Sequence, residues 1–303
     1  MTGKTDTLYG IQKLRAIAAY GVVVFHLFEF LNAASSLGFP RFTLGRTGVD
    51  LFFVISGFIM VYTTRDAETP REFMAKRVSR IVPLYWAATL VTVALVAVAP
   101  SIFPAADISW QKILASLAFI PAADHAGEAM PVLLVGWSLN MEMFFYVIFA
   151  TAMFLPARVR LSALLTGIVG LVLACRLFAD GTLAGDFYGR IIMLDFAAGC
   201  VLAYLLRLPA LAAFMRRTPT WPLMLVAAAG FVAAEYFLAS AKADIYDAAI
   251  GASATLLVFA VAGADLYRGT RRGRFLVPLG DASYSAYLLH PILLRPAAMV
   301  LAA

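Results

Sequence analysis

AIAAYGVVVFHLFEFLNAA, residues 16–34, is apolar along almost its whole length and is interrupted only by His26, Glu29 and Asn32. As an α-helix rising 1.5 Å per residue, a stretch of this length covers about 28 Å, close to the ~30 Å hydrocarbon core of a bilayer. Similar runs recur along the chain, at residues 48–64, 81–99, 135–155, 161–178, 189–206, 221–239, 246–266 and 281–301. We therefore predict an all-α fold, a polytopic transmembrane helical bundle of about nine to ten spans.

The composition of the chain argues against the other broad classes. Of its 303 residues, 62% are hydrophobic and 14% are charged, which is more apolar surface than a soluble domain can cover. A membrane β-barrel would need alternating segments of about ten residues, and the sequence has none. We expect a single integral membrane domain over residues 1–303 with no appended soluble domain. The short apolar segment 112–121 is read as a re-entrant helix, an interfacial helix, or part of a tenth crossing.

The basic residues set an orientation. If the N-terminus is cytoplasmic and there are nine spans, the outer segments hold only Arg41, Arg46, Lys112 and Lys242. The inner segments then hold Lys4, Lys13, Arg15, Arg65, Arg71, Lys76, Arg77, Arg80, Arg158, Arg160, Arg207, Arg216, Arg217, Arg268, Arg271, Arg272 and Arg274. This asymmetry follows the positive-inside rule. We therefore read the excess of 24 basic over 18 acidic residues as orientation, with no nucleic acid as partner.

The ends of the predicted spans agree with this orientation. Trp86 and Trp221 fall near the inner boundary, and Trp110 and Trp137 near the outer one, as interfacial aromatic belts do. A cleaved signal peptide is the alternative reading of the basic N-terminus and its apolar run. The ionisable His26 inside that run argues for a retained first span.

His26 is the foremost candidate for chemistry. An ionisable side chain near the bilayer centre costs about 2.5 to 3.5 kcal/mol on insertion scales, so it is a functional candidate by default. His26 follows Arg15 by eleven residues, which returns to nearly the same helix face about 16 Å further along. One face thus carries a cation at the cytoplasmic mouth and an imidazole near mid-depth. The structural alternative is a buried histidine that a neighbouring helix satisfies.

The segment REFMAKRVSRIVPLYW, residues 71–86, carries a second constellation. Arg77 and Arg80 share a helix face at i, i+3, and Lys76 lies beside Arg80. Two guanidinium groups on one face suit a phosphate clamp, because each can donate two parallel hydrogen bonds. A basic loop that only sets topology is the alternative. Pro83 is expected to open the next span, where its missing N–H costs little.

The fourth predicted span carries a carboxylate. In GWSLNMEMFFY, Ser138, Glu142 and Tyr146 follow one another at i, i+4 and are expected to line one face at the outer third of the span. Glu142 needs a partner or a watery cavity there.

Asp50, in RTGVDLFFVISGF, has two equally open readings. An acidic residue at the start of a helix complements the helix dipole, and it can equally serve as a site residue. Gly57 in the same span would permit a close approach between helices.

The last predicted span also brings polar groups into the membrane, in LGDASYSAYLLHP. Interhelical hydrogen bonding explains Tyr284, Tyr287 and His290 as readily as chemistry does. Cys175 and Cys200 lie in apolar segments, and neither has a partner at a metal-ligand spacing. We therefore expect packing cysteines and no metal.

Five segments in this order resemble the acyltransferase 3 family of bacterial membrane acyltransferases, and the resemblance covers nearly the whole chain. They are LRAIAAYGVVVFH with Arg15 and His26, GVDLFFVISGF, KRVSRIVPLYW with Arg77 and Arg80, WSLNME with Glu142, and LGDASYSAYLLH. The opening GIQKLRAIAA is most similar to the exopolysaccharide O-acetyltransferase branch.

The resemblance implies a bacterial inner (cytoplasmic) membrane enzyme with the membrane lipid around it, and family members usually have ten spans. It implies acetyl-CoA or another acyl-CoA as co-substrate, no permanently bound cofactor, and a carbohydrate or lipid-linked saccharide as acceptor. It also implies that His26 is the essential catalytic residue and that arginines of the cytoplasmic loop, Arg77 and Arg80, contact the donor. We add Arg15 to the donor contacts because it lies at the same cytoplasmic mouth.

As a hypothesis, neutral His26 acts as general base toward the acceptor hydroxyl, with an acyl-histidine intermediate as the variant. Glu142 or Asp50 would orient the imidazole or bind the sugar hydroxyl. The main rival is a transporter that uses His26 and Glu142 as a proton relay, although the sequence lacks the repeated halves typical of that class. A scaffold subunit of a polysaccharide export system is the third reading.

Overall fold

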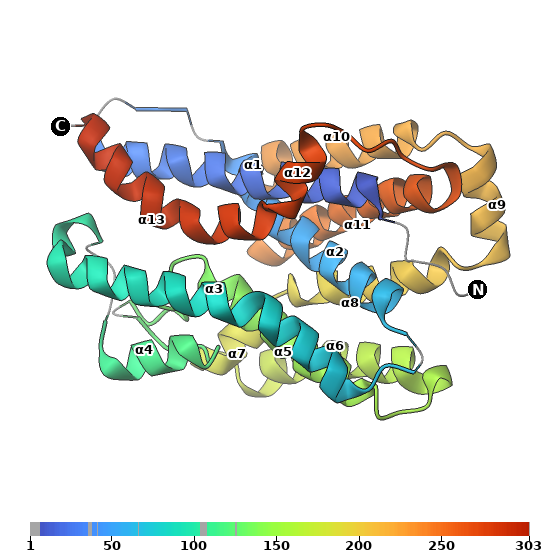
Figure 1. Cartoon of the computed structure of the whole chain (residues 1–303), viewed down its shortest axis with the longest axis horizontal. Coiled ribbons are helices and arrows are strands. Elements are labelled where there is room, and N and C mark those ends of the chain that lie inside the picture. Colours follow the sequence, from blue (N-terminus) through green and yellow to red (C-terminus); the bar gives the residue numbers. More distant parts are fainter. Residues whose placement is uncertain are drawn as a thin grey trace. The chain divides into compact units, whose positions relative to one another are not determined.

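A computed structural model describes residues 7–302, except 36, 37, 41, 66, 104–107 and 125. Lys4 and Arg41, two of the basic residues that predict the orientation, lie outside the described residues. The described chain folds into α-helices joined by 3-10 turns and loops (Figure 1). The prediction of an all-α helical bundle is confirmed.

Two compact units divide the chain, and each is built from segments that are distant in sequence. Unit 1 comprises Met1–Val22, Thr43–Asp66 and Ile191–Tyr284, and unit 2 comprises Val23–Phe42, Ala67–Arg190 and Ser285–Ala303. The long helices α1 (Tyr9–Ala34) and α13 (Ser283–Ala302) contribute to both units. The prediction of a single membrane domain remains a prediction.

The other helices belong to one unit each. Unit 1 contains η1 (Thr43–Thr47), α2 (Gly48–Thr63), α8 (Met193–Leu205), α9 (Pro209–Arg217), α10 (Trp221–Leu238), α11 (Ala243–Arg268) and α12 (Leu276–Asp281). Unit 2 contains α3 (Pro70–Val98), η2 (Pro100–Ile102), α4 (Trp110–Leu117), α5 (Gly136–Ala152), α6 (Ala157–Phe178) and α7 (Leu183–Tyr188).

Several helices are long and apolar enough to cross a membrane. Among the described residues seven segments meet that standard, namely Tyr9–Ala34, Thr43–Thr63, Pro70–Val98, Ala157–Phe178, Leu183–Leu205, Trp221–Leu238 and Ala243–Arg268. The two other predicted spans are helical as well, as the 17-residue α5 and as α13. The multi-pass architecture is confirmed, and the count of nine spans remains a prediction.

The outward faces of these helices are themselves apolar. Leu90 on α3, Leu173 on α6 and Val226 on α10 are 53%, 53% and 60% exposed. Exposing large aliphatic side chains on several helices costs free energy in water, whereas contact with lipid tails removes that cost. The surface therefore matches the membrane environment that the composition indicates.

In unit 1, α2 and α8 pack with their backbones in contact. A Cβ atom at Gly57 would lie 2.1 Å from the carbonyl oxygen of Phe196, and one at Gly199 would lie 2.0 Å from that of Val54. Only glycine permits this distance, since both positions lack the atom that would collide. The close helix approach predicted at Gly57 is confirmed.

Hydrogen bonds in unit 1 join segments that are predicted to lie on the cytoplasmic side of the membrane. Lys13 Nζ donates to the carbonyl oxygen of Arg271 at 2.9 Å, and Arg268 Nη1 donates to that of Thr218 at 3.1 Å. All four residues belong to segments predicted to be cytoplasmic. Alternate crossings of the membrane bring such segments together, so these contacts support the predicted topology of unit 1.

The start of α3 differs from the prediction. Thr69 caps this helix: its hydroxyl accepts from the Glu72 N–H at 3.2 Å, and its own N–H donates to the Glu72 carboxylate at 2.9 Å. Pro70 stands in the first turn, where a proline is tolerated. The expectation that Pro83 opens the helix is wrong, because this capping box starts it at Pro70 and leaves Pro83 inside.

The segment predicted as re-entrant, interfacial or part of a tenth crossing forms α4. Its eight residues cover about 12 Å, too little to cross a bilayer. Trp86 Nε1 donates to the Leu117 carbonyl at 2.9 Å, and the rings of Tyr85 and Phe119 lie 4.6 Å apart. These contacts fall near the middle of α3, so the end of α4 packs part-way along that helix. The length of α4 leaves the re-entrant and interfacial readings, and the place of Trp86 at the inner boundary of the membrane remains a prediction.

Candidate active site

His26 lies against a second histidine in unit 2. His26 Nδ1 on α1 and His290 Nε2 on α13 are 3.1 Å apart, within hydrogen-bonding distance, and the two ring centroids are 4.9 Å apart. His290 is 4% exposed, whereas His26 is only partly buried. Phe30 packs on the His26 ring at 5.8 Å, and Phe25 meets its edge at 4.9 Å. The pair therefore holds one imidazole in place while leaving part of it accessible.

The surroundings of His290 bear on the tautomers of the pair. His290 Nδ1 is buried and has no hydrogen-bond partner among the described residues. The direction of the 3.1 Å hydrogen bond depends on the tautomers of the two rings. When His290 Nε2 is the acceptor, His26 Nδ1 is the donor, and His26 Nε2 keeps the lone pair that a base requires.

Tyr287 fixes α13 against α5 one turn before His290. Its hydroxyl lies 2.8 Å from Ser138 Oγ and also donates to the Val135 carbonyl at 3.3 Å. The interhelical role that the sequence suggested for the last span fits Tyr287. His290 differs, because its partner is the foremost site candidate. Sequence reasoning missed this pairing, since 264 residues separate the two histidines.

Glu142 and Arg77 belong to one cluster around Tyr146. The Tyr146 hydroxyl donates to Glu142 Oε1 at 2.5 Å, and the Arg77 guanidinium lies over the rings of Phe73 and Tyr146, at 5.2 and 5.7 Å. The sequence placed Glu142 toward the outer end of its span and Arg77 in a cytoplasmic segment. The structure brings both to the same stretch of the α3–α5 interface, because α3 already begins at Pro70.

The other basic residues of α3 differ from Arg77 in their surroundings. Arg80, one turn further along, is exposed, whereas Arg77 is partly buried. Lys76 is tied by an ion pair of 2.7 Å to Glu68. The predicted face with Arg77 and Arg80 therefore exists on α3, and its two arginines differ in how firmly they are held.

Arg15 lies in unit 1, where α12 and the start of α13 hold it. Its guanidinium donates to Ser283 Oγ at 3.0 Å and to Gln12 Oε1 at 3.2 Å, and Gln12 in turn donates to Asp281 at 3.0 Å. A Cβ at Gly280 would lie 2.0 Å from the Gln12 carbonyl, so α12 touches the backbone of α1 there. The LGDAS segment thus positions Arg15.

Asp50 is a buried residue in the first turn of α2, at 8% exposure, and it belongs to unit 1, whereas His26 belongs to unit 2. Its carboxyl interacts directly with that of Asp195 on α8. The proposed role of Asp50 in orienting His26 remains a prediction. Asp195 is a residue that sequence reasoning missed, although a lone carboxylate inside the span 189–206 is a signal of the kind that singled out His26.

A second residue that the sequence reasoning missed is Asn140 on α5. It is 1% exposed, and neither its side-chain oxygen nor its nitrogen has a hydrogen-bond partner among the described residues. An unsatisfied buried amide costs about 1 to 3 kcal/mol. Groups of this kind are functional candidates, since folding alone would favour an apolar residue there.

Comparison with known proteins gives the family. The family model described as acyltransferase domain, of the acyltransferase 3 type, matches residues 8–303. The chain is 38% identical over 264 residues to the exopolysaccharide production protein ExoZ of Rhizobium meliloti (strain 1021), which covers 86% of this chain and 79% of ExoZ. No solved structure matches the chain.

Two further relatives are more distant. The acyltransferase MdmB of Streptomyces mycarofaciens is 26% identical over 283 residues, covering 84% of this chain and 69% of MdmB. The O-acetyltransferase OatA of Staphylococcus aureus (strain NCTC 8325 / PS 47) is 27% identical over 315 residues, covering 93% of this chain and half of OatA. These matches confirm the prediction of an acyltransferase enzyme and disfavour the transporter and scaffold readings. The chain belongs to the acyltransferase 3 family and is a membrane-bound O-acyltransferase.

Proposed function

We propose that this protein transfers an acetyl group from cytoplasmic acetyl-CoA to a hydroxyl of an exopolysaccharide or related envelope carbohydrate, with His26 as general base. The His26–His290 contact of 3.1 Å carries the proposal, because it gives one partly accessible imidazole a fixed orientation. The similarity to ExoZ supports the carbohydrate acceptor, and the similarity to OatA supports acetyl as the transferred group.

A single base is enough for this reaction, because the proton that it removes from the acceptor is returned to the leaving group. His26 Nε2 takes the proton of the acceptor hydroxyl as the oxygen attacks the thioester carbonyl carbon. The carbon–sulfur bond then breaks, and the imidazolium returns the proton to the departing CoA thiolate. His290 supports the imidazolium through its acceptor nitrogen, much as a carboxylate does in other base–orienter pairs. In the acyl-histidine variant, His26 Nε2 itself attacks the thioester and the acceptor hydroxyl then removes the acyl group from the ring.

Three arginines have the chemistry needed to bind the phosphate groups of acyl-CoA. CoA carries phosphate groups, and arginine forks bind phosphate through paired, charge-assisted hydrogen bonds. Arg77 and Arg80 on α3 and Arg15 on α1 belong to segments expected on the cytoplasmic side, where acyl-CoA is present. We propose that all three contact the donor and that the enzyme lies in the inner membrane with its N-terminus in the cytoplasm.

The test is acetyl transfer by the purified protein in proteoliposomes, with radiolabelled acetyl-CoA and an envelope polysaccharide extract as acceptor. His26→Ala should insert and fold normally while losing about 10²- to 10⁴-fold in turnover, the range for a general base. Transfer at the wild-type rate by His26→Ala would overturn the proposal. Label retained on the wild-type protein without acceptor, and lost in the variant, would identify the acyl-histidine route.

A further inference from the structure

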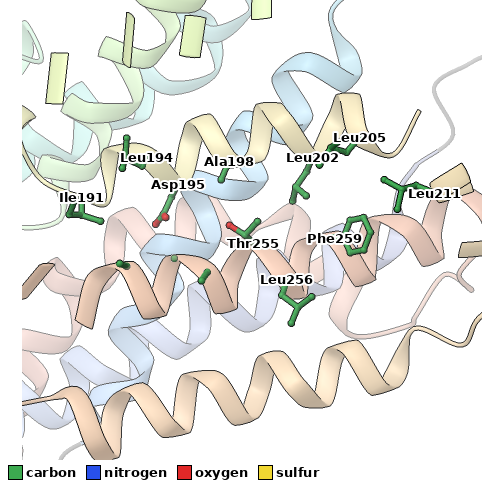
Figure 2. A pocket seen from close by; sticks show the side chains of 13 residues that line it. Ile191, Leu194, Asp195, Ala198, Leu202, Leu205, Leu211, Thr255, Leu256 and Phe259 are labelled. Carbon is green, nitrogen blue, oxygen red and sulfur yellow. The ribbon is translucent and has the colours of Figure 1, made fainter. Parts of the chain in front are cut away.

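Unit 1 contains a cavity that the proposed chemistry does not use. It has a volume of about 610 Å³ and lies between α8, α9 and α11 (Figure 2). Thirteen residues line it, and only Asp195 and Thr255 among them have polar side chains. The rest of the wall is leucine, isoleucine, alanine, glycine and phenylalanine. Such a wall suits a hydrocarbon, with two polar groups to orient it.

Asp195 is the polar anchor of this cavity. Its side chain is 5% exposed, and Oδ2 has no hydrogen-bond partner among the described residues. In Figure 2 the oxygens of Asp195 and Thr255 lie on facing sides of the cavity. A Cβ at Gly251 on α11 would lie 2.2 Å from Asp195 Oδ1, so that glycine makes room for the carboxyl. A buried acceptor atom without a donor favours a ligand that supplies one.

The shape of the cavity indicates a chain with a polar end. Asp195 lies toward one end of the lining, while Leu205, Leu211 and Phe259 lie toward the other. Ten residues of α8 separate Asp195 from Leu205, which is about 15 Å at 1.5 Å per residue. This length suits a single alkyl chain of membrane lipid.

The lining of the cavity selects the polar end of that ligand. None of its thirteen residues is a lysine or an arginine that would pair with a phosphate headgroup. The carboxyl group of Asp195 can instead form a hydrogen bond with a hydroxyl group. We propose that this cavity binds a lipid with an uncharged, hydroxyl-bearing head, a glycolipid, whose chain lies along α8 and whose hydroxyl donates to Asp195 Oδ2.

Photolabelling tests the site without measuring transfer. The protein is reconstituted in phosphatidylcholine nanodiscs and exposed to dodecyl glucoside or dodecyl phosphate, each with the same diazirine-bearing chain. We expect labelled peptides from α8 and α11 with the glucoside, and about tenfold less label there with the phosphate, the ratio that one hydrogen bond to a buried group supplies. Equal labelling by the two probes would show ordinary boundary lipid and overturn the proposal.

Variants locate the site. Ala198→Phe fills the cavity wall and should remove the glucoside label, and Asp195→Asn should lower it about tenfold. Val226→Phe, on an exposed face of α10 outside the cavity, is the matched control and should leave the label unchanged. Label that persists in Ala198→Phe would overturn the site. His26→Ala should label like the wild type, so a failure of the transfer chemistry and a failure of the lipid site give different results.

Discussion

At the scale of single residues, the proposed function makes His290 the residue that orients the imidazole of His26, through their 3.1 Å contact. His290→Gln keeps an acceptor oxygen near the position of Nε2, whereas His290→Leu removes it. We expect the Leu variant to lower kcat by about 10- to 100-fold with an unchanged KM for acetyl-CoA, less than the loss expected for the base itself, and the Gln variant to retain most activity.

The readout for His290 includes the pH profile of kcat, whose acidic limb reports protonation of the base in the enzyme–substrate complex. A purely structural role would lower the yield of folded protein and leave the shape of the profile unchanged. Identical kcat values and profiles for wild type, Gln and Leu would remove His290 from the mechanism.

Asn140 offers a residue-scale test of function against stability. The Asn140→Leu variant removes a buried amide without a hydrogen-bond partner, so it should keep or raise the apparent Tm, by about 2 °C per kcal/mol in a chain of this size. We expect turnover to fall if the amide binds a polar group of a substrate, which is the functional reading of its missing partners. Thermal unfolding and acetyl transfer are measured on the same preparation. A lower Tm with full activity would contradict this reading and make Asn140 structural.

At the scale of elements, α3 carries two arginines that differ in their surroundings. Arg80 is exposed, so Arg80→Lys should raise the KM for acetyl-CoA and leave the apparent Tm unchanged. Arg77 lies over two aromatic rings, so Arg77→Lys should raise that KM and also lower the Tm. Arg71→Lys, in the exposed first turn of α3, is the matched control and should change neither. A wild-type KM for acetyl-CoA in both Arg77→Lys and Arg80→Lys would contradict the clamp hypothesis.

The helices also show which parts of this fold a single sequence can predict. Every predicted span became a helix, because apolar runs near 20 residues are an unambiguous signal. The sequence misplaces the start of α3 because Pro83 resembles a first-turn proline, whereas the capping pair Thr69 and Glu72 lies upstream. His26 was found by its cost in lipid, but its contact with His290 depends on how α1 and α13 pack, which periodicity within one helix cannot reveal.

At the scale of the whole molecule, the orientation of every loop depends on the number of crossings. A tenth span between α3 and α5 would invert every segment that follows it, whereas a re-entrant α4 leaves the order unchanged. Ser240, between α10 and α11, would then be outside, and Arg272, between α11 and α12, would be cytoplasmic. The two positions therefore report opposite results for nine and ten spans.

Single-cysteine variants at these two positions test the topology, in a background where Cys175 and Cys200 are replaced by alanine. In intact spheroplasts we expect a membrane-impermeant maleimide to label Ser240→Cys and to reach Arg272→Cys only after permeabilisation. Glu128→Cys, beyond α4, should label from outside as well, because a re-entrant segment returns to the side it came from. The reverse pattern at Ser240 and Arg272 would establish an extra crossing. It would also place the loop between α11 and α12, which contacts Lys13 in unit 1, on the side opposite to acyl-CoA, and so remove Arg15 from the donor site.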